Sequence, residues 1–303
     1  MDELYKKIED KYKELGQDHV TYLKGLYHTR PINYWDYINL EALLSLQHPK
    51  TNYKDEYIFI VYHQITELVL RLIVHELEQV TSGELNDKKI IDDKLHRMMR
   101  YTDMLITSFS VMNKGMSYDD YNEFRLALAP ASGFQSAQFR IIELYCTSVD
   151  NLIQPHKKTE GFSSLSTQDK FELIYWQDAG KDHKTGKKSL TLTQFENKYL
   201  NQFIELAEKM KNNNLSALVT SWEKKGWLDD ELKSTLKAFD RKFNIEWPMV
   251  HLVTAHTYLG SGKAEKAATG GSHWEKYLHP KYQRRIFFPQ LLTEEELTHW
   301  GEN

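Results

Sequence analysis

His63 is the first residue of this sequence whose type and position could do chemistry. On a helical wheel it shares a face with Phe59, Leu70 and Val74, so its imidazole falls on an apolar stripe. Such a histidine has two interpretations. It is a core residue bonded to a carbonyl group, or it lines a pocket and hydrogen-bonds a substrate or takes its proton, because imidazole titrates near neutral pH.

Arg125 and Tyr121 form a second candidate pair, one helical turn apart and shortly before Pro130. The arginine could extend along an apolar surface and pair with an acid. Alternatively, its guanidinium could bind a substrate carboxylate through two hydrogen bonds, with the Tyr121 hydroxyl beside it. Both interpretations fit the residues equally well.

His251 and His256 are the third candidate, and their spacing argues against a chelating pair. They are five positions apart, which is about 140° around a helix, so they do not share a face. The HExxH pattern and the paired Glu-x-x-His motifs of di-iron helical bundles are absent from the chain. A metal bound here would therefore take one ligand from this helix, as many haem irons do. The alternative is two ordinary helix histidines.

The only glycine-rich region runs from Gly260 to Ser272. Its first part, Gly260–Ala264, lacks the Ser or Thr that follows the lysine of a phosphate-binding loop. Its last part, Thr269–Ser272, offers successive backbone N–H groups and two hydroxyls to polar ligand groups. It would otherwise be an ordinary loop.

Helices must position these residues, because the chain is poor in the residues that break them. Its 303 residues include 7 Pro and 14 Gly, both below the usual shares of about 5% and 7%. Apolar spacing predicts one all-α domain over residues 1–303, without repeats or long linkers. The predicted helices are 2–15, 34–47, 55–80, 88–112, 118–128, 134–147, 192–211 and 228–256, with a polar loop at 178–189.

Composition excludes several classes of protein. The net charge of −4 gives no basic field for nucleic acid or anionic lipid. A single cysteine, Cys146, excludes a disulfide framework and fits a reducing compartment. The charged N-terminus lacks the apolar core of a signal peptide, and the longest apolar run, Tyr57–Tyr62, is far short of the roughly 20 residues of a membrane span. We therefore expect a soluble, cytoplasmic protein that binds neither nucleic acid nor a membrane.

Aromatic residues are abundant for a helical chain, with 18 Tyr, 13 Phe and 7 Trp. Together with His63, the Arg125/Tyr121 pair and His251, they suit a pocket for an aromatic molecule that carries a carboxylate.

Four blocks of sequence then follow one another along most of the chain. They are Tyr34–Leu40, Leu43–Ser45 and Gln47–Pro49; Asp55–Glu56, Phe59–Gln64, Glu67–Leu68 and His75–Leu77; Tyr121, Phe124–Arg125, Pro130, Ser132–Ser136 and Gln138; and Trp247, His251, Thr269–Ser272 and Phe287–Pro289. In this order they resemble the tryptophan 2,3-dioxygenases, helical haem enzymes that open the indole ring of L-tryptophan. The resemblance covers residues 34 to about 291.

The resemblance implies a role for each matched residue. It makes His251 the axial ligand of haem b, His63 the distal histidine that hydrogen-bonds the indole N–H, and Phe59 a wall beside the indole ring. The remaining implied roles are carboxylate binding by Arg125 and Tyr121, contact with the amino-acid end by Thr269, lining of the distal pocket by Ser132 and Gly133, and contribution to a neighbouring subunit's pocket by Tyr34, Tyr37 and Ile38.

The implied activity is insertion of O₂ across the indole C2–C3 bond of L-tryptophan to give N-formyl-L-kynurenine, a step of tryptophan catabolism by the kynurenine pathway. The implied assembly is a homotetramer, a dimer of dimers, in which an N-terminal helical arm, residues 1–33, docks on a neighbouring subunit.

The sequence departs from the family pattern at three places. Val69 and Arg71 stand where Trp and Lys are usual, Lys263–Lys266 are additional, and His273-Trp274 follow Thr269–Ser272 where Ser or Thr and then Gly are typical. The altered loop keeps a second interpretation open: a haem oxygenase of the same fold acting on another indole or phenolic amino acid. A non-catalytic haem sensor is a third, which the carboxylate clamp disfavours.

Overall fold

All regular elements of the described residues are helical, as predicted. The computed structural model describes residues 2–85, 87–182, 185–260, 275 and 278–302. Within these ranges, the extended pairings are two isolated bridges, Ile153 with Ile174 and Lys181 with Lys188. The α-helices are α1 Asp2–Glu14, α2 His19–His28, α3 Tyr34–Tyr37, α4 Leu40–Leu44, α5 Asp55–Val80, α6 Lys88–Gly115, α7 Tyr118–Phe124, α8 Ala137–Cys146, α9 Thr167–Phe171, α10 Tyr175–Ala179, α11 Leu190–Met210, α12 Leu215–Lys224, α13 Asp230–Arg241, α14 Trp247–Leu259, α16 Pro280–Gln283 and α17 Glu294–Thr298.

Contacts divide the chain into two units, Met1–Gln47 and His48–Asn303. The first unit contains α1 to α4, and none of these helices has a buried residue. The single helix predicted over 34–47 is wrong: α3 and α4 are separate, because Asn39 between them adopts a left-handed conformation with φ of 52°. That residues 1–303 form one domain, with 1–33 as an arm, stays a prediction.

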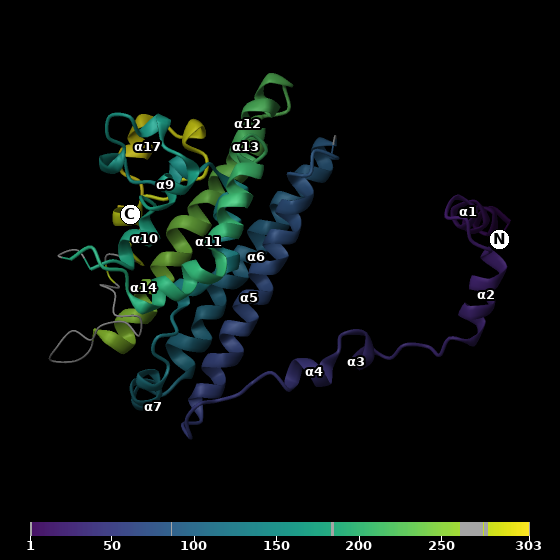
Figure 1. The fold of residues 1–303 in the computed structure, drawn as a ribbon, viewed down its shortest axis with the longest axis horizontal. Coiled ribbons are helices and arrows are strands. Elements are labelled where there is room, and N and C mark those ends of the chain that lie inside the picture. Colours follow the sequence, from purple (N-terminus) through teal and green to yellow (C-terminus); the bar gives the residue numbers. More distant parts are fainter. Residues whose placement is uncertain (1, 86, 183–184, 261–274, 276–277, 303) are drawn as a thin grey trace. The chain divides into compact units, whose positions relative to one another are not determined.

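The second unit is built around α5, whose predicted bounds are confirmed. This helix packs against α6, α7 and α8, and α6 also packs against α13 and α14 (Figure 1). The central core includes Ile73, Leu77, Leu95 and Phe124, all fully buried. By length and composition alone, α5 is apolar enough to cross a membrane. In this structure it is the central helix of the bundle.

Local capping explains where several of these helices begin. The Asp87 carboxylate accepts the backbone N–H groups of Lys89 and Ile90 at the start of α6. The Ser136 hydroxyl accepts the Phe139 N–H at the start of α8. Each cap satisfies N–H groups that have no partner inside the helix.

Other predicted helices need correction. The segment 118–128 is α7 followed by the 3-10 turn Arg125–Ala127, and 134–147 contains the 3-10 turn Gly133–Gln135 before α8. Helix α12 lies in a stretch for which no helix was predicted.

The predicted helix 228–256 is interrupted as well. It is α13, a π-helical turn at Lys242–Glu246, and α14. Pro248 gives the physical reason, because a proline in a continuous helix lacks one N–H and its ring clashes with the carbonyl of the residue four positions earlier.

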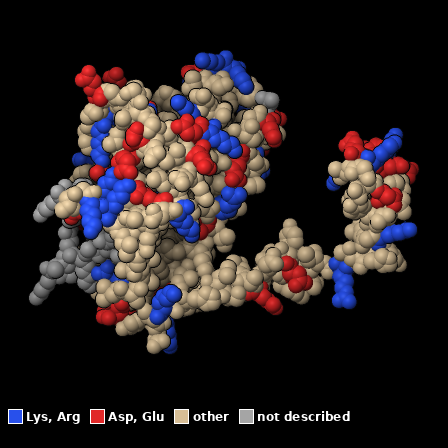
Figure 2. All heavy atoms as spheres, viewed as in Figure 1, with Lys and Arg blue, Asp and Glu red and all other residues tan. Residues whose placement is uncertain are grey.

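Charged residues of both signs are interspersed over the visible face of the unit His48–Asn303 (Figure 2). This pattern agrees with the net charge of −4.

Candidate functional site

His63 lies on α5, and its tautomer follows from one hydrogen bond. Nδ1 is 2.7 Å from the Phe59 carbonyl oxygen, so Nδ1–H donates to that oxygen and Nε2 keeps its lone pair. Burial lowers the pKa of His63 below its usual value, against the Phe59 hydrogen bond and the nearby charge of Glu67, which raise it. The ring is therefore neutral at pH 7 and presents an acceptor nitrogen.

Aromatic rings surround this imidazole on one side. The ring centroid of Phe59 is 4.1 Å from that of His63 and 6.2 Å from that of Tyr121. Phe124 meets Phe59 edge-on at 5.6 Å and Tyr121 edge-on at 5.5 Å. Helices α5 and α7 thus bring His63, Phe59 and Tyr121 together.

Arg125 follows directly after α7 and begins the 3-10 turn Arg125–Ala127. It is buried, with 7% of its surface exposed. Burial raises the pKa of the Tyr121 hydroxyl, and the positive charge of Arg125 opposes that rise, which places the two groups within electrostatic reach of each other. A buried guanidinium beside a protonated hydroxyl can donate hydrogen bonds to a carboxylate.

His251 lies on α14, on the far side of two aromatic rings from His63. Its ring stacks on Phe109 of α6 at 5.3 Å, Phe109 lies 5.6 Å from Tyr62, and Tyr62 meets His63 edge-on at 5.6 Å. Burial, followed by the charge of His63, lowers the pKa of His251 to about 4. The two histidines therefore belong to one region of the molecule.

The surroundings of His251 combine two properties that are usually separate. Protein atoms around the ring are dense enough to depress its pKa, yet the residue itself is exposed. The imidazole is therefore neutral at pH 7, and the residue is accessible from solvent. A neutral imidazole in such a place is a good ligand for a transition metal.

A haem group fits this donor set. His251 supplies one neutral nitrogen, which is what a proximal haem ligand requires. One turn earlier, Trp247 is buried and its indole Nε1 has no hydrogen-bond partner among the described residues. Within the same described residues, no three His, Cys, Asp or Glu side chains are grouped so that they could hold a metal ion.

Ser132 and Gly133 lie at the loop between α7 and α8. The Ser132 hydroxyl accepts the Phe134 N–H, and Gln135 anchors the loop by donating to the Thr191 carbonyl of α11 at 3.2 Å. Among the described residues, apart from its two chain neighbours, none has an atom within 4 Å of the position that a Cβ would occupy on Gly133, so this residue borders open space there. Their place in the distal pocket stays a prediction.

The roles of four further predicted site residues stay predictions. Thr269 lies outside the described residues. Tyr34, Tyr37 and Ile38 belong to the unit Met1–Gln47, where 70%, 74% and 36% of their surfaces are exposed.

The sequence did not reveal Phe109, Tyr62 or Tyr258 as parts of the site. Tyr258 of α14 packs against Tyr121 at 4.6 Å, and its hydroxyl donates to the carbonyls of Met112 and Met116 at the end of α6. These pairs join helices far apart in the chain, so helical spacing alone could not predict them.

A surface groove of the described residues lies elsewhere. It runs along α13 and the C-terminal segment and is lined by Lys237, Arg241, Ile245 and Trp300, among others. Among its described lining residues, none is a predicted site residue.

Comparison with known proteins points to one family. A model of the tryptophan 2,3-dioxygenase family matches residues 26–158. The tryptophan 2,3-dioxygenase of a Ruegeria species, strain TM1040, is 27% identical over 278 residues, which cover 86% of this chain and 91% of the relative. That of Bradyrhizobium diazoefficiens is 28% identical over 267 residues, covering 87% and 91%. That of Rattus norvegicus is 34% identical over 137 residues, covering 41% and 34%.

Proposed function

The chain belongs to the tryptophan 2,3-dioxygenase family, and we propose that it inserts both atoms of O₂ across the indole C2–C3 bond of L-tryptophan. That bond breaks, C2 becomes the formyl carbon and C3 the ketone carbon of N-formyl-L-kynurenine. The enzyme is an oxidoreductase of tryptophan catabolism, on the kynurenine pathway, and we place it in the cytoplasm. The observation that carries the proposal is the meeting of a neutral His63, Phe59 and Tyr121 on one side of a ring cluster that ends at His251.

His251 would hold haem b as its axial ligand. Ferrous haem, when bound, supplies the activation of O₂. The chain supplies the rest: it keeps His251 unprotonated, because burial lowers its pKa to about 4, and the residue is exposed, so that a haem could reach it.

His63 would orient the indole ring. Its Nδ1–H donates to the Phe59 carbonyl, so Nε2 can accept the indole N–H, and its lowered pKa keeps that nitrogen free of a proton. Phe59, whose ring centroid lies 4.1 Å from that of His63, would provide the apolar wall against which a flat ring lies.

Arg125 would bind the substrate carboxylate, with the protonated Tyr121 hydroxyl as a second donor. Removing one partner of a buried ion pair has a large energetic cost, because the other charge stays buried without a counter-charge. Thr269 would contact the amino-acid end, and Ser132 and Gly133 would line the pocket near the bound O₂.

A neighbouring copy would complete the pocket. The helices of the unit Met1–Gln47 have no buried residues and expose Tyr34 and Tyr37, so this unit lacks a core of its own. We propose that the arm, residues 1–33, docks on a neighbouring subunit of a homotetramer, a dimer of dimers, and that Tyr34, Tyr37 and Ile38 line that subunit's pocket.

The experiment that tests the function uses ferrous protein, O₂ and L-tryptophan, with N-formylkynurenine followed by its absorbance. The proposal expects product only when all three are present. Turnover of a substituted indole or of tyrosine, with none of L-tryptophan, would favour a haem oxygenase for another aromatic amino acid. Haem binding without turnover of any of them would favour a sensor.

A further inference from the structure

The direction in which His251 points depends on the π-helical turn Lys242–Glu246. Within it, the Trp247 N–H donates to the carbonyl of Lys242, five residues earlier instead of four. One extra residue in a turn rotates everything that follows by about 100° relative to a continuous α-helix. Trp247 and His251 both come after the turn, so its presence decides which side of α14 faces Phe109.

Pro248 requires an interruption of the regular α-helix, but it does not determine that the interruption is a π turn. A kink or an unwound turn would also relieve the clash of the proline ring with the carbonyl four residues earlier. An additional contact must therefore stabilise the π form.

That contact is a buried pair at the turn, Asp240 and Asn244. The Asn244 amide donates to Asp240 Oδ1 at 2.7 Å. The other carboxylate oxygen accepts the backbone N–H groups of Phe287 and Phe288 at 2.9 and 3.0 Å. Asp240, Phe287 and Phe288 are fully buried, and Asn244 nearly so, with 1% exposed.

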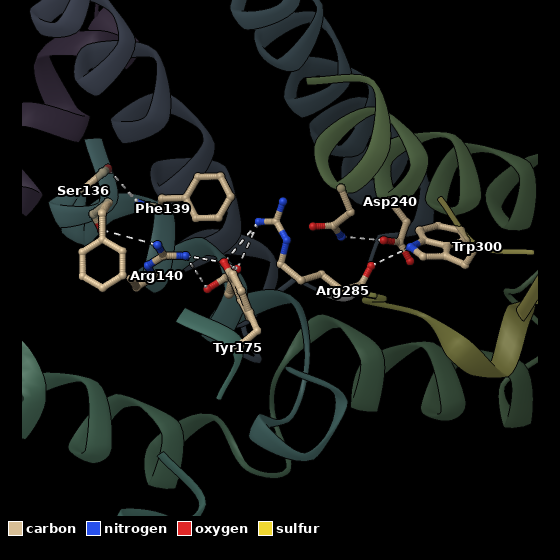
Figure 3. A network of polar contacts seen from close by, with 10 residues as sticks. Ser136, Phe139, Arg140, Tyr175, Asp240, Arg285 and Trp300 are labelled. Atoms are coloured by element: carbon tan, nitrogen blue, oxygen red, sulfur yellow. Dashed lines mark hydrogen bonds and ion pairs between the residues drawn. The ribbon is translucent and has the colours of Figure 1, made fainter. Parts of the chain in front are cut away.

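The C-terminal segment that is hydrogen-bonded to Asp240, around Arg285–Phe288, makes further hydrogen bonds of its own. Arg285 donates to the Glu143 carboxylate at 3.2 Å and to the Tyr175 hydroxyl at 3.3 Å, and its carbonyl accepts the Trp300 indole N–H at 2.8 Å (Figure 3). Asp240 thus ties the π turn to a fixed support that comes from α8, α10 and the end of the chain.

Ring contacts also connect the C-terminal segment with the helical turn before His251. Phe243, in the π turn, lies 5.6 Å from Phe287 on one side and 5.3 Å from Trp247 on the other. Phe139 of α8 covers both Phe243 and Trp247, at 5.0 and 5.2 Å. The helical turn directly before His251 is therefore held between the C-terminal segment and α8.

We propose that Asp240, acting through Asn244 and the Phe287-Phe288 backbone, is a positioning residue that fixes the rotation of α14 and so aims the His251 imidazole at the haem iron. The inference rests on the proposed function, because it assumes haem on His251. The positioning role requires the hydrogen bonds of Asp240 and not its charge. An asparagine at position 240 can accept both backbone N–H groups through its side-chain carbonyl. Its NH₂ group can donate to Asn244 Oδ1 after the Asn244 amide has rotated by 180°.

The test compares haem-loaded wild type with Asp240→Ala and Asp240→Asn. Haem transfer to apomyoglobin gives the rate of loss, and the iron–histidine stretching band of the ferrous form reports the geometry of the axial bond. We expect Asp240→Ala to lose haem at least about tenfold faster, with a shifted or broadened band, since buried donors are left unpaired. Asp240→Asn keeps both wild-type values.

Asn214→Ala is the matched control. Asn214 is also buried, and its side chain makes three hydrogen bonds, to Ala217, Met210 and Lys211, but at the start of α12. We expect it to lower the melting temperature without changing the iron–histidine band. If Asp240→Ala does not fold, Asn244→Ala replaces it, because that variant frees the π turn and leaves the bonds from Asp240 to Phe287 and Phe288.

The possible outcomes separate the two claims. Wild type that binds no haem overturns the proposed function, and this inference with it. Wild type that binds haem on His251, with an unchanged band in Asp240→Ala or Asn244→Ala, overturns the positioning role alone. Equal changes in the band for Asn214→Ala would also overturn it, because they would show a general effect of lost stability.

Discussion

The two histidines of the site are held in different ways. His63 lies in the middle of α5, an unbroken helix of 26 residues, and its ring is fixed by a carbonyl one turn earlier in the same helix. His251 lies beyond a π turn that is held by Asp240 and by a segment more than 30 residues further along the chain. The first is positioned by local sequence and the second by tertiary contacts.

Their chemistry differs accordingly. A hydrogen-bond acceptor such as Nε2 of His63 tolerates some variation in angle, because hydrogen bonds weaken steeply only at large deviations. An axial ligand needs its nitrogen at a fixed distance and direction from the metal. The role with the stricter geometry, that of metal ligand, thus belongs to His251, which is positioned by more tertiary contacts than His63.

Removing each imidazole in turn gives the largest expected effect on this comparison. His251→Ala should purify without stoichiometric haem, because its axial ligand is gone. His63→Ala should keep its haem and lose turnover. Haem content per chain, measured from the Soret band, checks both. Full occupancy of His251→Ala with an unchanged band would contradict the assignment of the ligand.

Arg125→Leu comes next and affects the α7 side of the site. Loss of one partner of a buried ion pair costs about 3–5 kcal/mol, so the L-tryptophan concentration for half-saturation should rise roughly a hundredfold or more. The haem spectrum should stay as in wild type. Titration of the protein with L-tryptophan measures the change, and an unaltered affinity would refute the carboxylate clamp.

The pH dependence of the free energy of unfolding tests the role of Asp240, which holds the turn before α14. Burial raises the pKa of Asp240 to about 7, against the bonds from Asn244, Phe288 and Phe287, which lower it. Between its ordinary value of 3.8 and about 7, the folded chain binds more protons at this group than the unfolded chain does. This contribution to stability is complete below pH 3.8 and is lost as the pH rises through 7.

Asp240→Asn should remove that loss, since an amide does not ionise. We expect the variant to gain on wild type as the pH rises from 4 to 8, by up to about 4 kcal/mol in the free energy of unfolding. Urea denaturation at a series of pH values gives the two curves. Parallel curves would show that Asp240 does not titrate in this range.

Tyr121→Phe should have the smallest effect. It removes one hydroxyl donor near Arg125 and leaves the ring contacts with Phe59 and Phe124 in place. A single hydrogen bond is worth about 0.5–1.5 kcal/mol, so affinity for L-tryptophan should fall about 2- to 10-fold. A loss as large as that of Arg125→Leu would mean that the tyrosine, and not the arginine, is the main carboxylate donor.

Regular helical spacing explains how much of the fold could be predicted. The polar stripe of α5 predicted its bounds, and the placement of His63 beside Phe59 follows from the same periodicity. The segment 34–47 was predicted wrongly, because the left-handed turn at Asn39 depends on one backbone conformation that the apolar pattern does not encode.

Pro248, which lies inside a helical pattern, indicates that the helix is interrupted. It does not indicate that the interruption is a π turn. The choice of a π turn depends on Asp240, Asn244 and the backbone of Phe287 and Phe288, which meet only in the folded chain. The same is true of Phe109 against His251. Residues were predictable where one helix positions them, and not where two distant segments do.

The most direct test of the central claim is a single turnover with labelled oxygen. Ferrous protein is mixed with L-tryptophan and ¹⁸O₂, and the product is analysed by mass spectrometry. The proposed dioxygenase gives N-formylkynurenine that carries both labelled oxygen atoms, one in the formyl group and one in the ketone. A product with one labelled atom and one from water, or unchanged L-tryptophan in haem-loaded protein, would contradict it.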